Sequence, residues 1–187
     1  MERAIALSER SLTLPRVTAV ILGAAFVALA AQIAVPLPGT PVPMTLQPLA
    51  VLLVGGLLGA RLGATSMVLY LALGIAGLPV FTPTVPLFGI ARLLGPTGGY
   101  LLAYPVAAWV VGATVREGWE WWRVALGVLA GLMLIHVGGL AQLAILTGNV
   151  SAAARLGTLP FLLGDLGKLA VAVAVLTKLT PAVRARL

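Results

Sequence analysis

Two charged residues of opposite sign lie three positions apart in an otherwise apolar stretch near the end of the chain. The segment PFLLGDLGK holds Asp165, the only aspartate of the sequence, and Lys168. On a helix this spacing puts both side chains on one face, and a charge at the centre of a membrane helix costs about 2.5–3.5 kcal/mol on insertion scales. Two roles can explain them: an ion pair that fixes helix packing, or a polar site that binds a small solute carrying hydrogen-bond donors and acceptors.

A third charged residue, Arg92, lies just before the glycine-rich segment GPTGGY. It is either a loop charge in water or the partner of a ligand carboxylate, to which a guanidinium gives two parallel hydrogen bonds. The glycines that follow allow the backbone to approach a ligand closely. The segment lacks the spacing and the lysine of a P-loop, so nucleotide binding is not expected.

Polar and aromatic side chains on other apolar segments extend the candidate site. Thr45 and Gln47 open such a segment, where the threonine either caps the helix or contacts a ligand, and the glutamine brings an amide into the membrane. Tyr100 and Tyr104 share a helix face, which an aromatic belt at the membrane interface or a ligand site can explain. His136, in the middle of a helix, is expected to be a packed core residue rather than a ligand.

Catalytic, metal and nucleic-acid sites are not expected. The chain has no Cys, one His and one Asp, and neither GxSxG nor HExxH occurs. The net charge is +7, but the basic residues fall singly between apolar runs and not in the dense stripe that binds nucleic acid. We therefore expect a protein that is not an enzyme and holds no cofactor or metal.

Composition predicts that helices in a lipid bilayer position these residues. Of 187 residues, 60% are hydrophobic and 9% are charged, against about 25% charged in soluble domains. We predict an all-α, polytopic membrane protein with a single domain, residues 1–187. Its six helices are expected at about 17–35, 45–59, 62–78, 100–115, 122–146 and 160–179, with outer loops at 36–44, 79–99 and 147–159.

The basic residues predict the orientation of this bundle. With the N-terminus in the cytoplasm, nine Lys and Arg residues fall inside, Arg92 and Arg155 fall outside, and Lys168 is in the membrane. This bias follows the positive-inside rule, so both termini are expected in the cytoplasm. Residues 1–16 carry acidic as well as basic side chains and no small-residue cleavage signal, which predicts a retained cytoplasmic segment rather than a signal peptide. An amphipathic surface helix is one form that such a segment can take.

Small residues four positions apart mark the first predicted helix. They form the pairs Ala24 with Ala28 and Ala30 with Ala34. Such spacing lets membrane helices approach closely, although an Ala-rich segment also shows it by chance. The four alanines are therefore candidates for a face that docks on a partner.

Three blocks of the sequence occur in a characteristic order across roughly residues 36–178: PVPMTLQPLAVLLVGGLLGARLGATSMVLYLALGIAGLPVF, LLGPTGGYLLAYPVAAWVVG and PFLLGDLGK. Together they resemble the BioY family, the biotin-binding S components of energy-coupling factor transporters. The resemblance implies a six-helix fold in the cytoplasmic membrane of a prokaryote, with a biotin site near the outer face. It also implies two kinds of partner, a transmembrane T component and a pair of ABC-type ATPases that use the ATP, and docking through the four alanines.

The resemblance implies roles for the charged candidates. Asp165 and Lys168 match its GDxxK block, where Asp165 is expected to accept hydrogen bonds from the ureido N–H groups of biotin. Lys168 is expected to donate to the ureido carbonyl or to hold Asp165 in place. Tyr100 is expected to pack on the bicyclic ring, and Arg92 to bind the valerate carboxylate.

Other positions leave parts of the site open. Gln47 and Thr45 lie in the TLQ block, whereas His136 and Gln142 stand where aromatic residues are expected in this family. Two alternatives remain: an S component for another vitamin, and a stand-alone or proton-coupled secondary transporter in which Asp165 and Lys168 relay protons. The GPTGGY and GDxxK blocks favour biotin.

Overall fold

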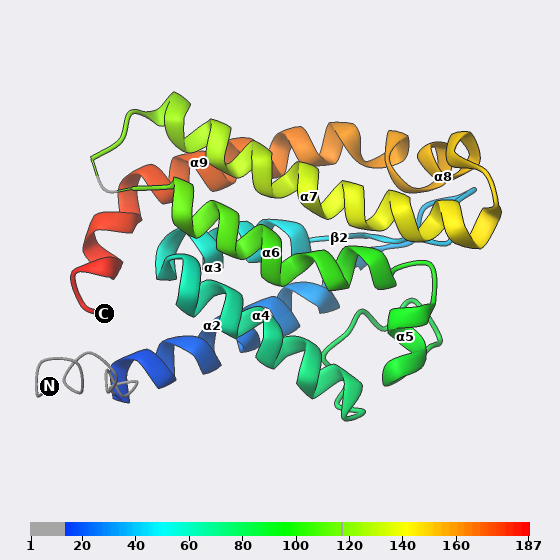
Figure 1. Ribbon diagram of the computed structural model, residues 1–187, viewed down its shortest axis with the longest axis horizontal. Helices are drawn as coiled ribbons and strands as arrows, with labels where there is room; N and C mark the ends of the chain where they lie inside the picture. Colours follow the sequence, from blue (N-terminus) through cyan, green and yellow to red (C-terminus); the bar gives the residue numbers. More distant parts are fainter. Residues whose placement is uncertain (1–13, 117) are drawn as a thin grey trace, which may run out of the picture.

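The chain forms a bundle of helices with one short β-hairpin (Figure 1). The computed structural model describes residues 14–116 and 118–187. The elements are α2 (Leu14–Gln32), β1 (Ala34–Val35), β2 (Met44–Thr45), α3 (Gln47–Leu58), α4 (Ala60–Ile75), α5 (Ile90–Leu94), α6 (Gly98–Thr114), α7 (Trp121–Thr147), α8 (Val150–Gly157), the 3-10 helix η1 (Leu159–Phe161) and α9 (Leu162–Arg184). Most of the predicted N-terminal segment, residues 1–13, lies outside the described residues.

The two ends of the bundle carry different elements (Figure 1). The start of α2, the turn between α6 and α7 and the end of α9 lie together at what we name the terminal end. The β-hairpin, α5 and α8 lie at the opposite end, the loop end. The segments 36–44, 79–99 and 147–159, which the sequence predicts on one face, therefore meet at the loop end.

The first helix ends earlier than the sequence predicts. It stops at Gln32, and the next residues pair in antiparallel register, Ala34 with Thr45 and Val35 with Met44. The residue before a proline avoids the helical region, and Pro36 follows Val35 directly. The chain thus leaves the helix for an extended hairpin arm.

Two predicted loops contain helices. The segment 79–99 includes α5, and 147–159 includes α8 and the start of η1. Asn149 caps α8, because its side chain accepts a hydrogen bond from the N–H of Ala152 at 3.1 Å. The last helix begins at Leu162 and continues to Arg184, five residues past the predicted end at 179.

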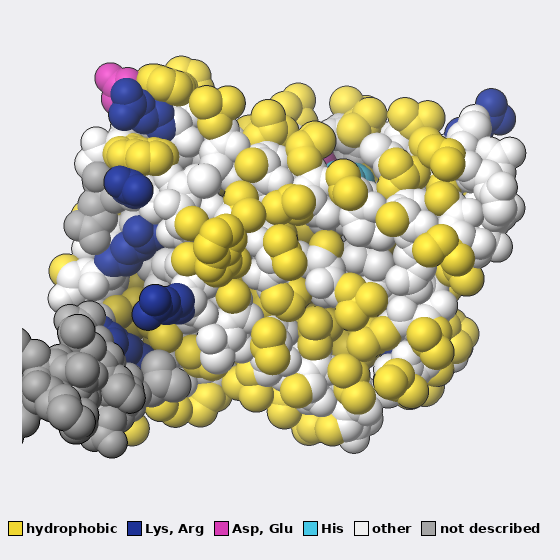
Figure 2. Space-filling view, viewed as in Figure 1, with side chains coloured by type: hydrophobic (Ala, Val, Ile, Leu, Met, Phe, Trp, Pro, Cys, Tyr) yellow, Lys and Arg dark blue, Asp and Glu magenta, His cyan; other side chains and the backbone are white. Residues whose placement is uncertain are grey.

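The helices have the character of membrane segments. Within the described residues, α2, α7 and the helical segment Val150–Arg184 are long and apolar enough to cross a membrane, and α3, α4 and α6 are apolar but shorter. The sides of the bundle are covered with hydrophobic side chains (Figure 2), among them the exposed Phe26, Leu102 and Leu163. A continuous apolar surface of this extent is typical of contact with lipid rather than with water.

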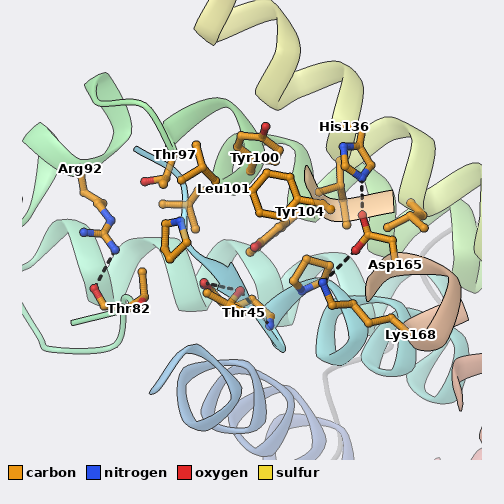
Figure 3. A pocket seen from close by; sticks show the side chains of 17 residues that line it. Thr45, Thr82, Arg92, Thr97, Tyr100, Leu101, Tyr104, His136, Asp165 and Lys168 are labelled. Atoms are coloured by element: carbon orange, nitrogen blue, oxygen red, sulfur yellow. Dashed lines mark hydrogen bonds and ion pairs between the residues drawn. The ribbon is translucent and has the colours of Figure 1, made fainter. Parts of the chain in front are cut away.

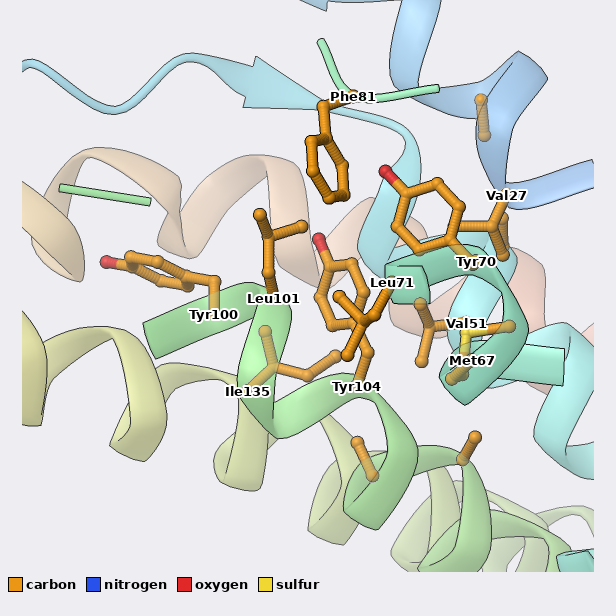
Figure 4. Packing of buried hydrophobic residues seen from close by; sticks show 14 of the residues in the cluster. Val27, Val51, Met67, Tyr70, Leu71, Phe81, Tyr100, Leu101, Tyr104 and Ile135 are labelled. Carbon is orange, nitrogen blue, oxygen red and sulfur yellow. The ribbon is translucent and has the colours of Figure 1, made fainter. Parts of the chain in front are cut away.

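Helix α6 lies at the centre and packs against α3, α4 and α7. Close packing against α3 depends on Gly55, where an added Cβ would lie 2.5 Å from the carbonyl oxygen of Ala108. The core near the loop end is aromatic (Figure 4). Tyr70 meets Phe81 edge-on with ring centroids 5.4 Å apart and lies 6.5 Å from Tyr104. This cluster forms a rigid wall beside the cavity described next.

Candidate functional site

A cavity lies in the loop half of the bundle, between β2, α5, α6, α7 and α9 (Figure 3). Its empty volume, including the part continuous with solvent, is about 560 Å³. Apolar side chains make up part of the wall, as in most small-molecule sites. The polar and aromatic lining residues are Thr45, Gln47, Thr82, Arg92, Thr97, Tyr100, Tyr104, His136, Phe161, Asp165 and Lys168.

Asp165 and Lys168 form a buried ion pair on the cavity wall. Lys168 Nζ donates to Asp165 Oδ1 at 2.8 Å, and the side chains of Lys168 and Asp165 are 8% and 6% exposed. The two roles that the sequence left open are therefore both compatible with the structure, since the pair is internal and also lines the cavity. The ammonium has three hydrogens, so it keeps donors for a further partner.

His136 joins this pair from α7 (Figure 3). Its Nε2 lies 2.7 Å from Asp165 Oδ2, so both carboxylate oxygens have a partner. The sequence predicted a packed core histidine. Its side chain is indeed mostly buried, 11% exposed, but it also lines the cavity and ties α7 to α9 through Asp165.

Arg92 is buried and not a loop charge in water. Its side chain is 1% exposed, and the guanidinium donates to the carbonyl oxygens of Thr82 at 2.7 Å and Val85 at 2.6 Å. Burial lowers the pKa of Arg92 below its usual value, because it disfavours the charged form. An anionic partner beside the guanidinium would stabilise that charged form. Helix α5 holds this side chain over the cavity on the side away from Asp165 (Figure 3).

Three buried polar atoms of the lining residues have no hydrogen-bond partner within the described part of the chain: Arg92 Nε, Thr97 Oγ1 and His136 Nδ1. A buried polar group without a partner costs free energy, so such groups mark places where a ligand or water completes the bonding. Two of them, on Arg92 and Thr97, lie at the same side of the cavity (Figure 3).

Tyr100 and Tyr104 are buried, 8% and 3% exposed, which excludes a belt of lipid-facing aromatic residues. The hydroxyl of Tyr100 donates to the carbonyl oxygen of Gly157 on α8. Its ring occupies the space that a side chain at Gly139 would fill and meets His136 edge-on, with centroids 6.3 Å apart. Both tyrosines present apolar ring surface to the cavity.

Thr45 and Gln47 form the wall contributed by β2 and α3. The hydroxyl of Thr45 accepts the backbone N–H of Gln47 and donates to its Oε1, both at 3.2 Å. The amide nitrogen of Gln47 donates to Tyr70 Oη at 2.7 Å. Thr45 therefore supports the start of α3 as a cap would, and it lines the cavity at the same time.

The alanines predicted as a docking face do not form one exposed face. Ala24 and Ala30 are 1% and 7% exposed because they pack against the chain's own core, and Ala34 lies in β1 rather than on the helix. Ala28 is partly buried and lines an apolar groove between α2 and α4. The four-residue spacing on α2 thus serves internal packing at Ala24 and Ala30.

The sequence does not single out two threonines of the lining, Thr82 and Thr97. Their only signal is that they are polar residues in the apolar loop on either side of Arg92.

Gln142 does not line the cavity. Its side-chain nitrogen donates to the carbonyl oxygens of Leu93 at 2.8 Å and Gly95 at 2.6 Å. It therefore holds the end of α5 in place.

Comparison with known proteins agrees with this architecture. The model of the BioY family matches residues 5–185. The chain belongs to the BioY family. Among its relatives are the probable biotin transporter BioY of Pyrococcus horikoshii, 40% identical over 87% of this chain and 94% of the relative, and the biotin transporter BioY of Thermotoga maritima, 38% identical over 83% and 89%.

The fold of this BioY-family chain is also similar to that of a solved structure. It is the crystal structure of the S component for biotin from an ECF-type ABC transporter, with a TM-score of 0.79 and 26% identity. The match covers 91% of this chain and 93% of the solved one. The helical membrane fold and the transporter family are therefore shared along almost the whole length.

Proposed function

We propose that this chain captures biotin and supports its uptake as the S component of an energy-coupling factor transporter. Family membership and the relatives support this function. The observation that carries it is the cavity with two charged ends (Figure 3): the Asp165–Lys168 pair at one side and Arg92 at the other. Biotin has the same layout, with a ureido ring at one end and a carboxylate at the end of an apolar chain.

The pair on α9 suits the ureido group. A ureido ring offers two N–H donors and one carbonyl acceptor. Asp165 keeps further lone pairs beyond its bonds to Lys168 and His136, so it accepts from a ureido N–H, and the remaining hydrogens of Lys168 donate to the ureido carbonyl. Tyr100 and Tyr104 enclose the apolar bicyclic ring.

The guanidinium of Arg92 suits the carboxylate. Its Nε–H has no partner within the described residues, and Nη2 keeps a second hydrogen after its bond to Thr82. These two nitrogens lie on one edge of a guanidinium, the edge that binds a carboxylate through two parallel hydrogen bonds. The unpartnered hydroxyl of Thr97 is a third donor at this end of the cavity.

The membrane arrangement follows from the same architecture. We infer six spans, α2, α3, α4, α6, α7 and α9, with both termini in the cytoplasm and the biotin site facing outward. The Lys and Arg side chains that gather at the terminal end (Figure 2) support this orientation under the positive-inside rule. Helix α3 has 12 residues, about 18 Å at 1.5 Å per residue, so its flanking hairpin completes that crossing.

The partners follow from the same proposal. A T component and a pair of ABC-type ATPases bind this chain and use ATP, and biotin reaches the cytoplasm when the site turns inward. The chain itself needs no cofactor for this role. The apolar groove that includes Ala28 is the part of the predicted docking face that stays accessible.

Calorimetry of the purified, biotin-stripped protein with biotin and with thiamine tests the proposal. We expect tight binding of biotin and none of thiamine. Asp165→Asn should lower the affinity for biotin by about a hundredfold. A hydrogen bond to a charged group is worth about 1.5–3 kcal/mol, and the buried groups that bind the carboxylate also lose a charged partner. Full affinity in this variant would remove Asp165 from the site, and tight thiamine binding would refute the choice of vitamin.

The carboxylate assignment has a separate test. Arg92→Ala should lower the affinity for biotin much more than the affinity for the amide of biotin, because the amide carries no charge. Because Arg92 also holds two loop carbonyls, the ratio of the two losses is the measurement, and Arg92→Lys serves as a variant that keeps the charge without the planar fork. Equal losses for both ligands would contradict the assignment.

A further inference from the structure

A groove on the membrane-facing side of the bundle lies at the terminal end, opposite to the biotin cavity. It runs from the turn between α6 and α7 along the first two turns of α7. Its empty volume, including the part open to the surroundings, is about 700 Å³. The residues that carry the argument are Trp119, Trp122, Arg123, Leu126 and Ala130.

Arg123 is a cation held by aromatic rings. Its guanidinium carbon lies 5.0 Å from the ring centroid of Trp122 and 5.9 Å from that of Trp119. Arg116 approaches the same Trp119 ring at 5.8 Å. Neither arginine makes an ion pair with an acidic side chain within the described residues, and both are exposed.

The surroundings favour an anion at this point. Glu120 is the acidic side chain that the described residues place in this turn, and its carboxylate already accepts the indole N–H of Trp122 at 2.5 Å. It makes no side-chain cap on α7, and the start of a helix attracts negative charge. Lys and Arg side chains gather over this end of the molecule (Figure 2).

The rest of the groove is apolar. Leu126 follows Arg123 by three residues and Ala130 follows Leu126 by four, which places them along one face of α7. Leu126 is 58% exposed. The groove therefore has a cationic, aromatic head at the end of the bundle and an apolar body that extends toward the middle of the membrane. A phospholipid has the same order of a charged head and an acyl chain.

We propose that this groove binds an anionic phospholipid, with the headgroup phosphate on Arg123 and Arg116 and an acyl chain along Leu126 and Ala130. An acidic soluble protein would satisfy the arginines but not the apolar body, which faces the bilayer. Tryptophan rings at this depth fit the interface between headgroups and acyl chains. The proposal depends on the membrane location of the chain and not on biotin.

Tryptophan fluorescence gives a direct test, because Trp119 and Trp122 line the groove and Trp121 is next to Trp122 in the chain. The full chain with Trp109→Phe, which removes the fluorophore on α6 that does not line the groove, is reconstituted into phosphatidylcholine vesicles. Lipids with brominated acyl chains are then added, either phosphatidylglycerol or phosphatidylcholine, and quenching is compared at equal mole fraction. We expect the anionic lipid to quench at roughly fivefold lower mole fraction, the factor expected for one basic residue near an anionic surface.

Arg123→Gln in the same background should remove this preference, and Arg116→Gln should reduce it. Arg186→Gln is the matched control, because it removes one charge from the exposed end of the chain without a tryptophan contact, and it should retain the preference. Soluble glycerol phosphate should not reverse the quenching, whereas reversal would indicate a free-anion site and overturn the lipid assignment. Equal quenching by both lipids, or an unchanged preference in Arg123→Gln, would also overturn it. Biotin binding by each variant verifies that it is folded.

Discussion

The carboxylate of Asp165 is held from two sides before any ligand arrives. Lys168 occupies one oxygen and His136 the other, so the side chain has one orientation and its free lone pairs point in set directions. A buried charge that is paired and hydrogen-bonded avoids most of the penalty that an isolated one would incur. The carboxylate is therefore preorganised, which favours affinity.

His136 should act as a positioning residue for Asp165. His136→Phe keeps a ring of similar shape beside Tyr100 but removes the hydrogen bond to Asp165. We expect biotin affinity to fall about tenfold, in line with about 1.5 kcal/mol for a hydrogen bond to a charged group. His136→Gln, whose amide can still donate to the carboxylate, should lose less. Isothermal calorimetry of the two variants decides the matter, and wild-type affinity in His136→Phe would exclude this role.

Sequence reasoning found Asp165, Lys168 and Arg92 because charge in an apolar segment is rare and costly. It did not predict the hydrogen bond between His136 and Asp165, two residues that are 29 positions apart in the chain and lie on different helices. Periodicity shows which side of a helix is apolar, but it contains no information on which two helices face each other. The pairing of α7 with α9 therefore needed the folded structure.

At the scale of elements, α5 acts as a cover over the cavity and is held by hydrogen bonds to neighbouring elements. Gln142 on α7 binds the carbonyls of Leu93 and Gly95, and Arg92 binds carbonyls of the preceding loop. A five-residue helix is not stable alone. Its position thus depends on these hydrogen bonds from neighbouring elements.

Gln142→Leu should loosen this cover without touching the cavity wall. The carbonyl oxygen of Leu93 loses the donor from Gln142, and that of Gly95 keeps the N–H of Gly98. A buried polar group left unsatisfied costs about 1–3 kcal/mol. We expect faster amide hydrogen exchange across residues 90–99 and a faster release of bound biotin, with little change in α4, which serves as the internal control. Hydrogen exchange read by mass spectrometry checks both regions, and unchanged protection of 90–99 would contradict the role of Gln142.

The sequence predicted the apolar helices within a few residues but not the hairpin, α5 or α8. Long apolar runs identify spanning helices because their burial in lipid needs internally bonded backbone. Short elements in Pro- and Gly-rich loops have no such local signal, since they are stabilised by tertiary contacts. The two-residue strands Ala34–Val35 and Met44–Thr45 are the extreme case.

For the molecule as a whole, the central position of α6 depends on close contact between its backbone and Gly55 of α3. Gly55→Ala would place a methyl group 2.5 Å from the carbonyl of Ala108, so α3 and α6 must separate. We expect a loss of roughly 1–3 kcal/mol in stability, as for other overpacked sites. Gly167→Ala on α9 meets nothing within 4 Å and should be neutral or slightly stabilising. Thermal unfolding in detergent compares the two, and equal melting temperatures would contradict this account.

The charge of the cavity has a consequence for transport in an energised membrane. Asp165 and Lys168 cancel each other, and Arg92 adds one positive charge that the carboxylate of bound biotin would neutralise. A loaded site that turns inward then does no electrical work, whereas an empty site that returns moves one charge against a negative interior, at about 2.3 kcal/mol per 100 mV for a complete crossing. Turnover in proteoliposomes with a clamped potential should therefore slow as the interior becomes more negative, because the unloaded return becomes the voltage-sensitive step.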